Sequence, residues 1–514
     1  MYRFLKNVLI LIVLIVCTFL NVKAQKNKVI ISGKFIGNNN SADSLTLCYW
    51  DNVISNQKKD FTIKRQYSSK VVNHSFSFEI DSIYDLSYIT IGRNKFRGVP
   101  IPLLDLMIVS PGDNVHVEIG AAEINEQEKQ WLTDDNGEKL CTNCDMFRFS
   151  GKSAATYSVQ YQLWEETKRL QAIWDTTSIA NSRVRDLVEQ SRRLYSNMNY
   201  VLTGGLKYLE ILRHSVSSSV FGLLTADLQG RIQELYFRGM NYHLKFTKRM
   251  GAANEVYLFR DEYNSIRDNF KVIERPEVQA KSNILPSTIL FKLALESTLF
   301  EENDIYSLIK DKYSGILQER LLTSYLLNNT NLPKIDSLLG EAVLLVNDKR
   351  YKEVLSSTLE NQKIGSGFFN YPLLDTSGKV FQLSCLKGKI IFIDFWFTGC
   401  GGCMQYYKQH VSKAENKFEN NEDVVFVTIS IDGNKDKWLQ GLRSGEYTSA
   451  KAINLYTNGQ GVAHPIIKRL NIIAYPFSII LDREGKLLIS DSEKLRKGGV
   501  EKLILTINEA ISKR

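Results

Sequence analysis

The sequence of 514 residues predicts a multidomain protein, with a mainly-β N-terminal domain, an all-α middle domain and a C-terminal α/β domain. Three observations predict this order. Apolar residues alternate with polar ones up to residue 150, recur three and four positions apart over residues 151–360, and form short continuous runs between helical segments over residues 366–514. At about 100 to 200 residues per domain, the chain length fits three such units.

The first 24 residues have the pattern of a secretory signal peptide. Arg3 and Lys6 precede the apolar run Val8–Leu20, and Val22 and Ala24 occupy the −3 and −1 positions of a cleavage site. The apolar run is shorter than the ~20 residues of a spanning helix, which favours cleavage over a membrane anchor. We therefore expect an exported protein in the periplasm or cell envelope, and a membrane-peripheral location stays open.

The formal net charge of +9 is spread along the chain, with basic and acidic residues interleaved. This distribution is typical of a solvated surface rather than of a nucleic-acid-binding patch. We therefore expect no nucleic-acid partner.

Residues 25–150 are expected to form a small β-sandwich or open barrel. Apolar and polar side chains alternate in Leu45–Tyr49, Phe76–Ile80 and Val115–Ile119, which marks strands with one buried face. Turn residues separate these segments, as in Ser110–Asp113.

Residues 151–360 are expected to form a helical domain. Apolar residues three and four positions apart predict helices over Leu163–Ile173, Val184–Tyr200, Ile232–Phe246 and Ile305–Leu327. The aromatic residues on these faces are expected in the core rather than in a ligand groove. A solenoid of paired helices remains an alternative arrangement.

Residues 366–514 are expected to form an α/β domain, which follows a short linker at residues 361–371. Fully apolar strands that alternate with helices indicate a sheet covered on both faces. The sequence predicts strands at Ile390–Trp396, Val424–Ile431, Phe477–Leu481 and Lys486–Ile489, and a final helix at Val500–Ile511.

Cys400 and Cys403 stand where the first of these strands ends and a helix is expected to begin. A cysteine at a helix N-terminus faces unsatisfied N–H groups and the positive end of the helix dipole, which lower the pKa of its thiol. The second cysteine lies one helical turn later and can attack a mixed disulfide formed at Cys400. This pattern predicts dithiol–disulfide exchange, whereas a zinc site would need a further set of ligands at a fitting spacing.

The segment Asp394-Phe395-Trp396, followed after three residues by Cys-x-x-Cys, resembles the thioredoxin superfamily. It is most similar to the exported TlpA/ResA-like branch of thiol–disulfide oxidoreductases. Similar segments are the lead-in Phe369–Lys389, the strand Val424–Asp432 and Ala474-Tyr475-Pro476. Residues 25–360 resemble, more weakly, the β-sandwich and helical regions that precede such domains in Bacteroidota-type proteins.

The resemblance implies catalytic roles for three matching positions. Cys400 would be the nucleophile, Cys403 the resolving thiol, and Asp394 the buried acid that exchanges a proton with Cys403. A lone carboxylate in an apolar strand needs a reason of this kind, because burial raises its pKa. The alternative is that Asp394 is satisfied by a neighbouring lysine or a backbone donor.

The resemblance also implies a substrate-binding surface and a set of partners. The surface would include Trp396, Tyr475 and Pro476, with Pro476 in the cis form. The substrates would be protein thiols and disulfides, the electron donor a membrane protein of the DsbD type, and the preferred direction reduction. No cofactor and no metal are expected.

The remaining cysteines allow several interpretations. Cys141 and Cys144 form a second C-x-x-C pair in a polar stretch, for which a small-loop disulfide is the first interpretation. A second redox pair, a metal site or free thiols are the alternatives. Cys385 is expected to be a free, partly buried thiol, and Cys48 a structural residue of a strand.

Two other functions stay open. A peroxiredoxin-like thiol peroxidase would have a related fold, but that chemistry wants a threonine three residues before the reactive cysteine, and Thr398 is two before Cys400. A non-catalytic cell-envelope interaction protein would use residues 25–360 to dock a partner. The intact Asp394, Cys400, Cys403 and Pro476 argue against this second function.

Overall fold

The computed structural model divides the chain into two compact units, Met1–Ser324 and Tyr325–Arg514. The expected signal peptide, residues 1–24, lies outside the described residues. The structure describes residues 27–36, 44–50, 63–121, 131–133, 139–141, 145–179, 186–362 and 365–512, apart from positions 82, 97, 98, 302, 303, 331, 333, 366, 368–370, 471, 473, 474, 491 and 497. Within these ranges, every helix is too short or too polar to cross a membrane.

The first unit begins with two four-stranded sheets that share one core. One sheet has the order β10-β7-β1-β4, with β1 and β7 parallel, and the other has the order β3-β2-β5-β6. Inward-facing residues of both sheets are buried together, and the predicted alternation is confirmed at Phe76–Ile80. The single buried face predicted for Leu45–Tyr49 is wrong, because this strand lies inside its sheet and is buried on both faces. The strands are β1 (Val29–Ile36), β2 (Ser44–Trp50), β3 (Ile63–Lys70), β4 (Ser75–Ile80), β5 (Ser87–Phe96), β6 (Val99–Val109), β7 (Asn114–Ala121), β10 (Asp145–Ser150) and the separate pair β8 (Trp131–Thr133) and β9 (Lys139–Cys141).

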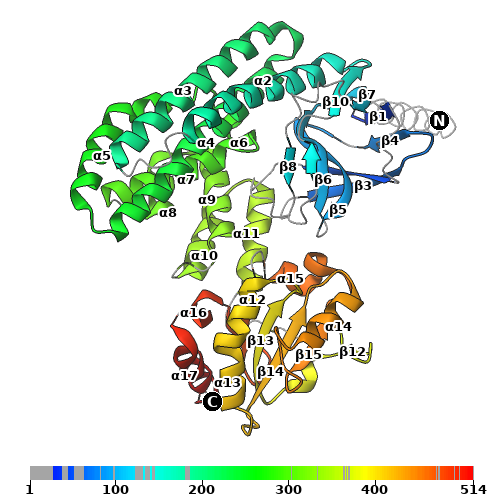
Figure 1. Cartoon of the computed structure of the whole chain (residues 1–514), viewed down its shortest axis with the longest axis vertical. Coiled ribbons are helices and arrows are strands. Elements are labelled where there is room, and N and C mark those ends of the chain that lie inside the picture. Colours follow the sequence, from blue (N-terminus) through cyan, green and yellow to red (C-terminus); the bar gives the residue numbers. More distant parts are fainter. Residues whose placement is uncertain are drawn as a thin grey trace, which may run out of the picture. The chain divides into compact units, whose positions relative to one another are not determined.

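Helices follow, and α2, α3 and α4 run side by side (Figure 1). The stretch Ile305–Leu327 is helical as predicted but forms two helices, because Tyr313 has an extended backbone and Gly315 has a φ of +60°. These two residues end one helix and start another. The helices of this unit are α2 (Ala154–Ile179), α3 (Leu187–Ile211), η1 (Arg213–Ser215), α4 (Ser218–Arg249), α5 (Ala253–Ile266), η2 (Arg267–Phe270), α6 (Pro276–Lys281), α7 (Leu285–Phe300), α8 (Ile305–Lys312) and α9 (Gly315–Asn328), which ends in the second unit.

Hydrogen bonds join the sheets to the helices within the first unit. The carboxylate of Asp227 on α4 accepts bonds from Tyr88 Oη at 2.8 Å, Ser282 Oγ at 2.5 Å and the backbone N–H of Asn283 at 3.1 Å. Burial raises the pKa of Asp227 to about 6. The expected domain boundary at residue 150 therefore lies inside one compact unit.

The second unit starts with helices and continues as a seven-stranded sheet of order β12-β11-β15-β14-β13-β16-β17. Strands β13, β14 and β15 are parallel to one another, while β16 and β17 are antiparallel to their neighbours. The strands are β11 (Leu373–Leu374), β12 (Val380–Phe381), β13 (Ile390–Trp396), β14 (Val424–Ser430), β15 (Ile453–Tyr456), β16 (Phe477–Leu481) and β17 (Leu487–Ile489). Its helices are α10 (Ile335–Leu345), α11 (Lys349–Gln362), η3 (Leu383–Leu386), α12 (Gly401–Tyr406), η4 (Tyr407–Val411), α13 (Ser412–Lys417), α14 (Lys435–Ser444), η5 (Gly461–Ala463), α15 (Pro465–Arg469), α16 (Ser492–Arg496) and α17 (Gly499–Ser512).

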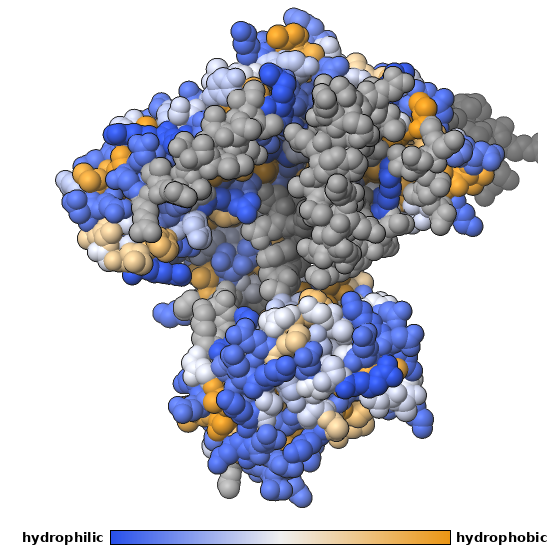
Figure 2. Space-filling model, viewed as in Figure 1, coloured by the Kyte–Doolittle hydropathy of each residue, from blue (hydrophilic) through white to orange (hydrophobic). Residues whose placement is uncertain are grey.

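The central strand β13 is buried on both faces. Ile393 packs in one hydrophobic cluster with Ile466 of α15, while Phe392 packs in another with Tyr406 and Ile507. Figure 1 shows α12 and α13 along one face of the sheet. Because side chains alternate along a strand, Asp394 lies on the same face as Phe392, under α12 and α13. The face of this unit that Figure 2 shows is predominantly hydrophilic, with small hydrophobic patches.

Candidate active site

Cys400 caps the N-terminus of α12 and is joined to Cys403 by a disulfide bond. The Cα atoms are 5.2 Å apart, and the Sγ of Cys400 accepts a hydrogen bond of 3.1 Å from the backbone N–H of Cys403. Both cysteines are buried, with 5% and 1% of their surface exposed. A sulfur in this position meets the partial positive charge of the first N–H groups of the helix, which stabilises a thiolate.

The loop that leads into α12 is held by side chains from the neighbouring strand and loop. Gly399 has a φ of +93°, and its N–H donates a bond of 2.8 Å to Tyr447 Oη. The backbone N–H and hydroxyl of Thr398 both donate to the carboxylate of Asp432, which is almost fully buried and also accepts a bond from Ser430 Oγ. These contacts fix the backbone immediately before Cys400.

Trp396 lies in the core rather than at the surface. Its side chain is fully buried and stacks on Tyr447, with ring centroids 4.8 Å apart. Helix α14 approaches it so closely that a Cβ at Gly441 would lie 2.8 Å from the Trp396 ring and 2.5 Å from Thr398 Oγ1. Trp396 belongs to the same buried cluster as Cys400 and Cys403, and its contact with substrate stays a prediction.

Tyr475 and Pro476 lie against the turn that carries the cysteines. The peptide bond between them is cis, and a Cβ at Gly402 would lie 3.4 Å from Pro476 Cδ and 3.8 Å from the carbonyl oxygen of Tyr475. Tyr475 is half-buried, and its ring packs edge-on against Phe397 with centroids 5.7 Å apart. The structure thus brings both residues together with the reactive pair.

Asp394 is buried on β13, with 1% of its surface exposed. Burial raises the pKa of its carboxyl to about 7, and this rise is opposed by the hydrogen bond from Ser478 and by the positive charge of Arg496. Burial and the nearby Asp394 also raise the pKa of Tyr406 on α12. A carboxyl with a pKa near neutral pH can accept or release a proton under ordinary conditions.

The helix after the cysteines contains one π-helical turn, η4, between α12 and α13. Cys403 and Tyr406 are buried before this turn, Val411 is buried at its end, and Ala414 is buried after it. A π-helical turn holds one more residue than an α-helical turn and is frequent at functional sites.

The other cysteines differ in their surroundings. Cys48 is buried in β2, as expected for a structural residue, and lies 4.0 Å from Gln66 Nε2. Cys385 is exposed rather than partly buried, because the short helix η3 buries Leu383 instead. Cys144 and the side chain of Cys141 lie outside the described residues, so their pairing stays a prediction.

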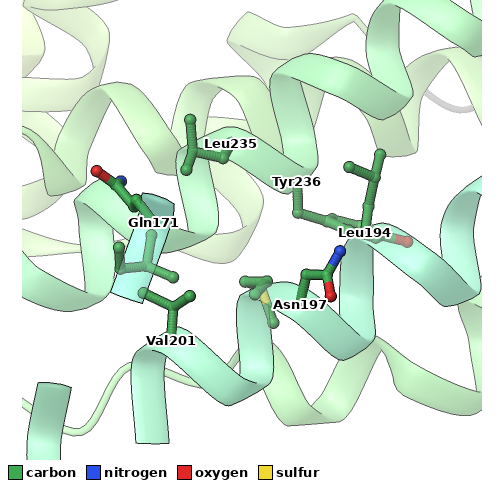
Figure 3. A pocket seen from close by; sticks show the side chains of 8 residues that line it. Gln171, Leu194, Asn197, Val201, Leu235 and Tyr236 are labelled. Carbon is green, nitrogen blue, oxygen red and sulfur yellow. The ribbon is translucent and has the colours of Figure 1, made fainter. Parts of the chain in front are cut away.

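Two cavities in the helical part of the first unit are lined by described residues that include no cysteine. The cavity of Figure 3, lined by Gln171, Asn197 and Tyr236 among others, measures about 10 Å³, which is room for about one water molecule. A wider groove of about 650 Å³ between α2 and α3 contains Glu166 and Arg169, which form an ion pair of 2.7 Å with each other. Within the described part of the chain, no group of three or more His, Cys, Asp or Glu residues is placed to hold a metal ion.

Comparisons with known proteins match this region. The family described as thioredoxin-like matches residues 388–487. Thiol-disulfide oxidoreductase ResA from Bacillus subtilis (strain 168) is 27% identical over 132 residues, which cover 24% of this chain and 64% of that protein. ResA from Bacillus anthracis is 25% identical over 140 residues, which cover 25% of this chain and 69% of that protein.

The matches to similar solved structures also cover less than a third of this chain. The thioredoxin domain of a thiol-disulfide oxidoreductase from Bacteroides vulgatus is 19% identical, with a TM-score of 0.24, and the match covers 29% of this chain and 97% of that chain. A thiol:disulfide interchange protein from Bacteroides sp. is 20% identical, with a TM-score of 0.25, and the match covers 30% of this chain and 95% of that chain.

Proposed function

We propose that this chain is a thiol–disulfide oxidoreductase of the TlpA/ResA-like type that acts through Cys400 and Cys403. The match of residues 388–487 to a thioredoxin-like family and the similarity to ResA support this proposal. One observation carries the proposal. Cys400 caps α12, accepts a hydrogen bond from the Cys403 N–H and is disulfide-bonded to Cys403 one turn along the helix. This geometry stabilises a thiolate at Cys400. It also places a second thiol where it can attack a mixed disulfide at Cys400 and release the substrate.

The proposed reaction has two exchange steps. In the reduced protein, the Cys400 thiolate attacks one sulfur of a substrate disulfide, forms a mixed disulfide and expels one substrate thiolate. The Cys403 thiol then loses its proton and attacks Cys400 Sγ, which expels the second substrate thiolate and closes the Cys400–Cys403 bond. Two electrons pass to the substrate.

We propose Asp394 as the acceptor of the proton that Cys403 loses. Its burial on the face of β13 beneath α12 and its pKa of about 7 support this role. Tyr475 and Pro476, which pack against the turn at Gly402, are proposed to contact the bound polypeptide.

We also propose that the protein works as a reductase in the periplasm or cell envelope. The sequence pattern of residues 1–24 supports export. A reductase in an oxidising compartment needs a continuing supply of electrons, for which a membrane donor of the DsbD type is the proposed partner.

The reduction potential of the cysteine pair tests this proposal. The chain without residues 1–24 would be equilibrated in glutathione buffers, with Cys400→Ser and Cys403→Ser as the test variants and the exposed Cys385→Ser as the matched control. A potential near ~−270 mV, unchanged in Cys385→Ser, is expected for a reductase. A value near ~−120 mV would reverse the proposed direction, and failure of these two cysteines to form a disulfide at any potential would refute the activity itself.

The peroxidase alternative gains no support from the loop before Cys400. The hydroxyl of Thr398 donates a hydrogen bond of 2.8 Å to Asp432. It is therefore already engaged with a buried carboxylate, whereas a peroxidase would use a threonine hydroxyl to orient peroxide at the reactive sulfur.

A further inference from the structure

A cavity of about 220 Å³ lies in the first unit, among α4, η2, α6 and α7 and the residue after α8. Gln233 and Phe237 of α4, Phe270 of η2 and Lys292 of α7 line it, and Lys271 follows η2 at its exposed side. It is distinct from the cysteine pair, which belongs to the second unit.

Gln233 is the buried polar residue of this cavity that the protein does not satisfy. It is 2% exposed, and its Nε2 has no hydrogen-bond partner among the described residues. The neighbouring polar groups are satisfied, since Thr288 Oγ1 donates to the carbonyl of Gly230 at 2.8 Å and Gln279 Nε2 donates to the carbonyl of Glu274 at 2.6 Å. A buried amide donor left unpaired is costly and uncommon, so it indicates an acceptor supplied by a ligand.

The charged groups of the cavity favour an anion. Lys292 is three-quarters buried, and burial lowers the pKa of its ammonium group. Its nearest carboxylate oxygen, on Glu296, is 3.9 Å away, while Glu296 already accepts bonds from Tyr263 Oη at 3.0 Å and from Lys312 Nζ at 3.2 Å. Lys271, which forms an exposed ion pair of 3.7 Å with Asp268, adds a second ammonium group at the exposed side.

The rest of the lining is apolar and aromatic. The rings of Phe237 and Phe270 are almost fully buried, with centroids 4.8 Å apart, and Ile289 also lines the cavity. Apolar walls with a few convergent donors are typical of sites for small organic molecules. The carboxylate of Glu296 beside Lys292 disfavours a dianion such as phosphate, because like charges repel at short range.

We propose that this cavity binds a small organic carboxylate, whose carboxylate group accepts hydrogen bonds from Gln233 Nε2 and Lys292 Nζ and whose apolar part packs on Phe237 and Phe270. The proposal does not depend on the redox function of the second unit. It places a small-molecule site in the helical part of the chain, whereas the alternative considered from the sequence was that residues 25–360 dock a partner protein.

Benzoate is a suitable probe, because it combines one carboxylate with one aromatic ring. Its binding to the full chain would be measured by calorimetric titration, beside neutral benzamide and inorganic phosphate at matched ionic strength. The test variants are Gln233→Leu and Lys292→Met. The matched control is Lys312→Met, which removes a lysine that pairs with the same Glu296 but does not line the cavity.

The expected result is saturable binding of benzoate that weakens at least tenfold in Gln233→Leu and Lys292→Met and less than threefold in Lys312→Met. Gln233→Leu should also keep or raise the thermal unfolding midpoint, because it removes a buried unpaired donor. A lower midpoint would mean that Gln233 serves the fold and would overturn the proposal. Equal binding of benzamide, stronger binding of phosphate, or the absence of saturable benzoate binding would overturn it as well.

Discussion

Ser478 Oγ donates a hydrogen bond of 2.8 Å to the carboxylate of Asp394, directly across the antiparallel pairing of β16 and β13. The bond favours the charged carboxylate, whereas burial favours the neutral form. The pKa of about 7 is the balance of these opposing effects together with the charge of Arg496. The alternatives considered from the sequence, a lysine or a backbone partner, did not include this hydroxyl.

Replacing Asp394 by Asn should change how stability depends on pH. The folded-state pKa of about 7 lies above the ordinary value of 3.8, so the folded protein holds this proton more tightly. The contribution of Asp394 to stability is therefore present at low pH and falls as the pH rises from about 4 to about 7. Asp394→Asn should abolish this fall in the free energy of unfolding. A pKa difference of about three units corresponds to a fall of about 4 kcal/mol.

Urea unfolding at pH 4.5 and pH 8.5 would measure the effect as a difference between variant and wild type. Asp423→Asn is the matched control, since Asp423 is half-exposed and pairs with Arg483 at the surface. If Asp394→Asn and the wild type lost stability equally between the two pH values, the raised pKa of Asp394 would be refuted.

Ser478→Ala should raise the pKa of Asp394 further, because it removes a hydrogen bond to the charged form. The carboxyl carbon of Asp394, followed by NMR titration of the oxidised protein, would report the shift. Ser444→Ala, which removes a hydroxyl that bonds the carbonyl of Gly441, should leave the titration unchanged. A lowered pKa in Ser478→Ala would contradict the assignment of this bond.

Gly399→Ala should lower the free energy of unfolding by about 1–2 kcal/mol, because an L-residue is strained at positive φ. The φ of Gly399 is +93°, and its N–H is bonded to Tyr447. Gly401→Ala is the matched control, since Gly401 opens α12 and its Cβ would meet no atom within 4 Å. Urea unfolding should show the control to be neutral or more stable by up to about 1 kcal/mol, as alanine favours helix. Equal effects at the two glycines would contradict the backbone argument.

Gly441→Ala should destabilise the protein by about 1–3 kcal/mol through overpacking. The added Cβ would lie 2.5 Å from Thr398 Oγ1 and 2.8 Å from the Trp396 ring, so the loop before Cys400 has to move. We also expect slower disulfide exchange, measured by the rate at which dithiothreitol reduces the pair. The control is Gly340→Ala on α10, where the added Cβ would have no neighbour within 4 Å. It should lower neither the free energy of unfolding nor the rate of reduction. Wild-type stability and rate in Gly441→Ala would show that the packing can relax without cost.

The strands of the second unit show what a sequence pattern can predict. Strands β13 and β16 have the predicted bounds, because each is an apolar run with one polar residue, buried in the centre of a sheet. Strand β15 was not predicted, since it spans Ile453–Tyr456 alone and four residues carry little periodic signal. Its pairing with β14 depends on contacts between distant segments.

Some residues of the candidate site were likewise predicted from the sequence, and others were not. The cysteine pair and its helix were predicted from adjacent residues, and Asp394 stood out as a lone carboxylate in an apolar strand. Asp432 and Tyr447 were not recognised, because they reach the loop from segments 34 and 48 residues away in the chain. A polar residue in or just after an apolar strand, such as Ser478 or Asp432, was the available signal.

Because of the π-helical turn η4, the direction in which the cysteine pair faces depends on the number of residues between α12 and α13. Each residue of an α-helix turns the chain by about 100° around the axis. Deleting one residue between Tyr407 and Val411 would restore a regular helix, but with α13 held against the sheet it would rotate Cys403 by about that angle away from β13. The rotation of α12, which carries the cysteines, relative to α13, which packs on the sheet, is thus set by the length of this segment. It does not depend on which side chains the segment contains.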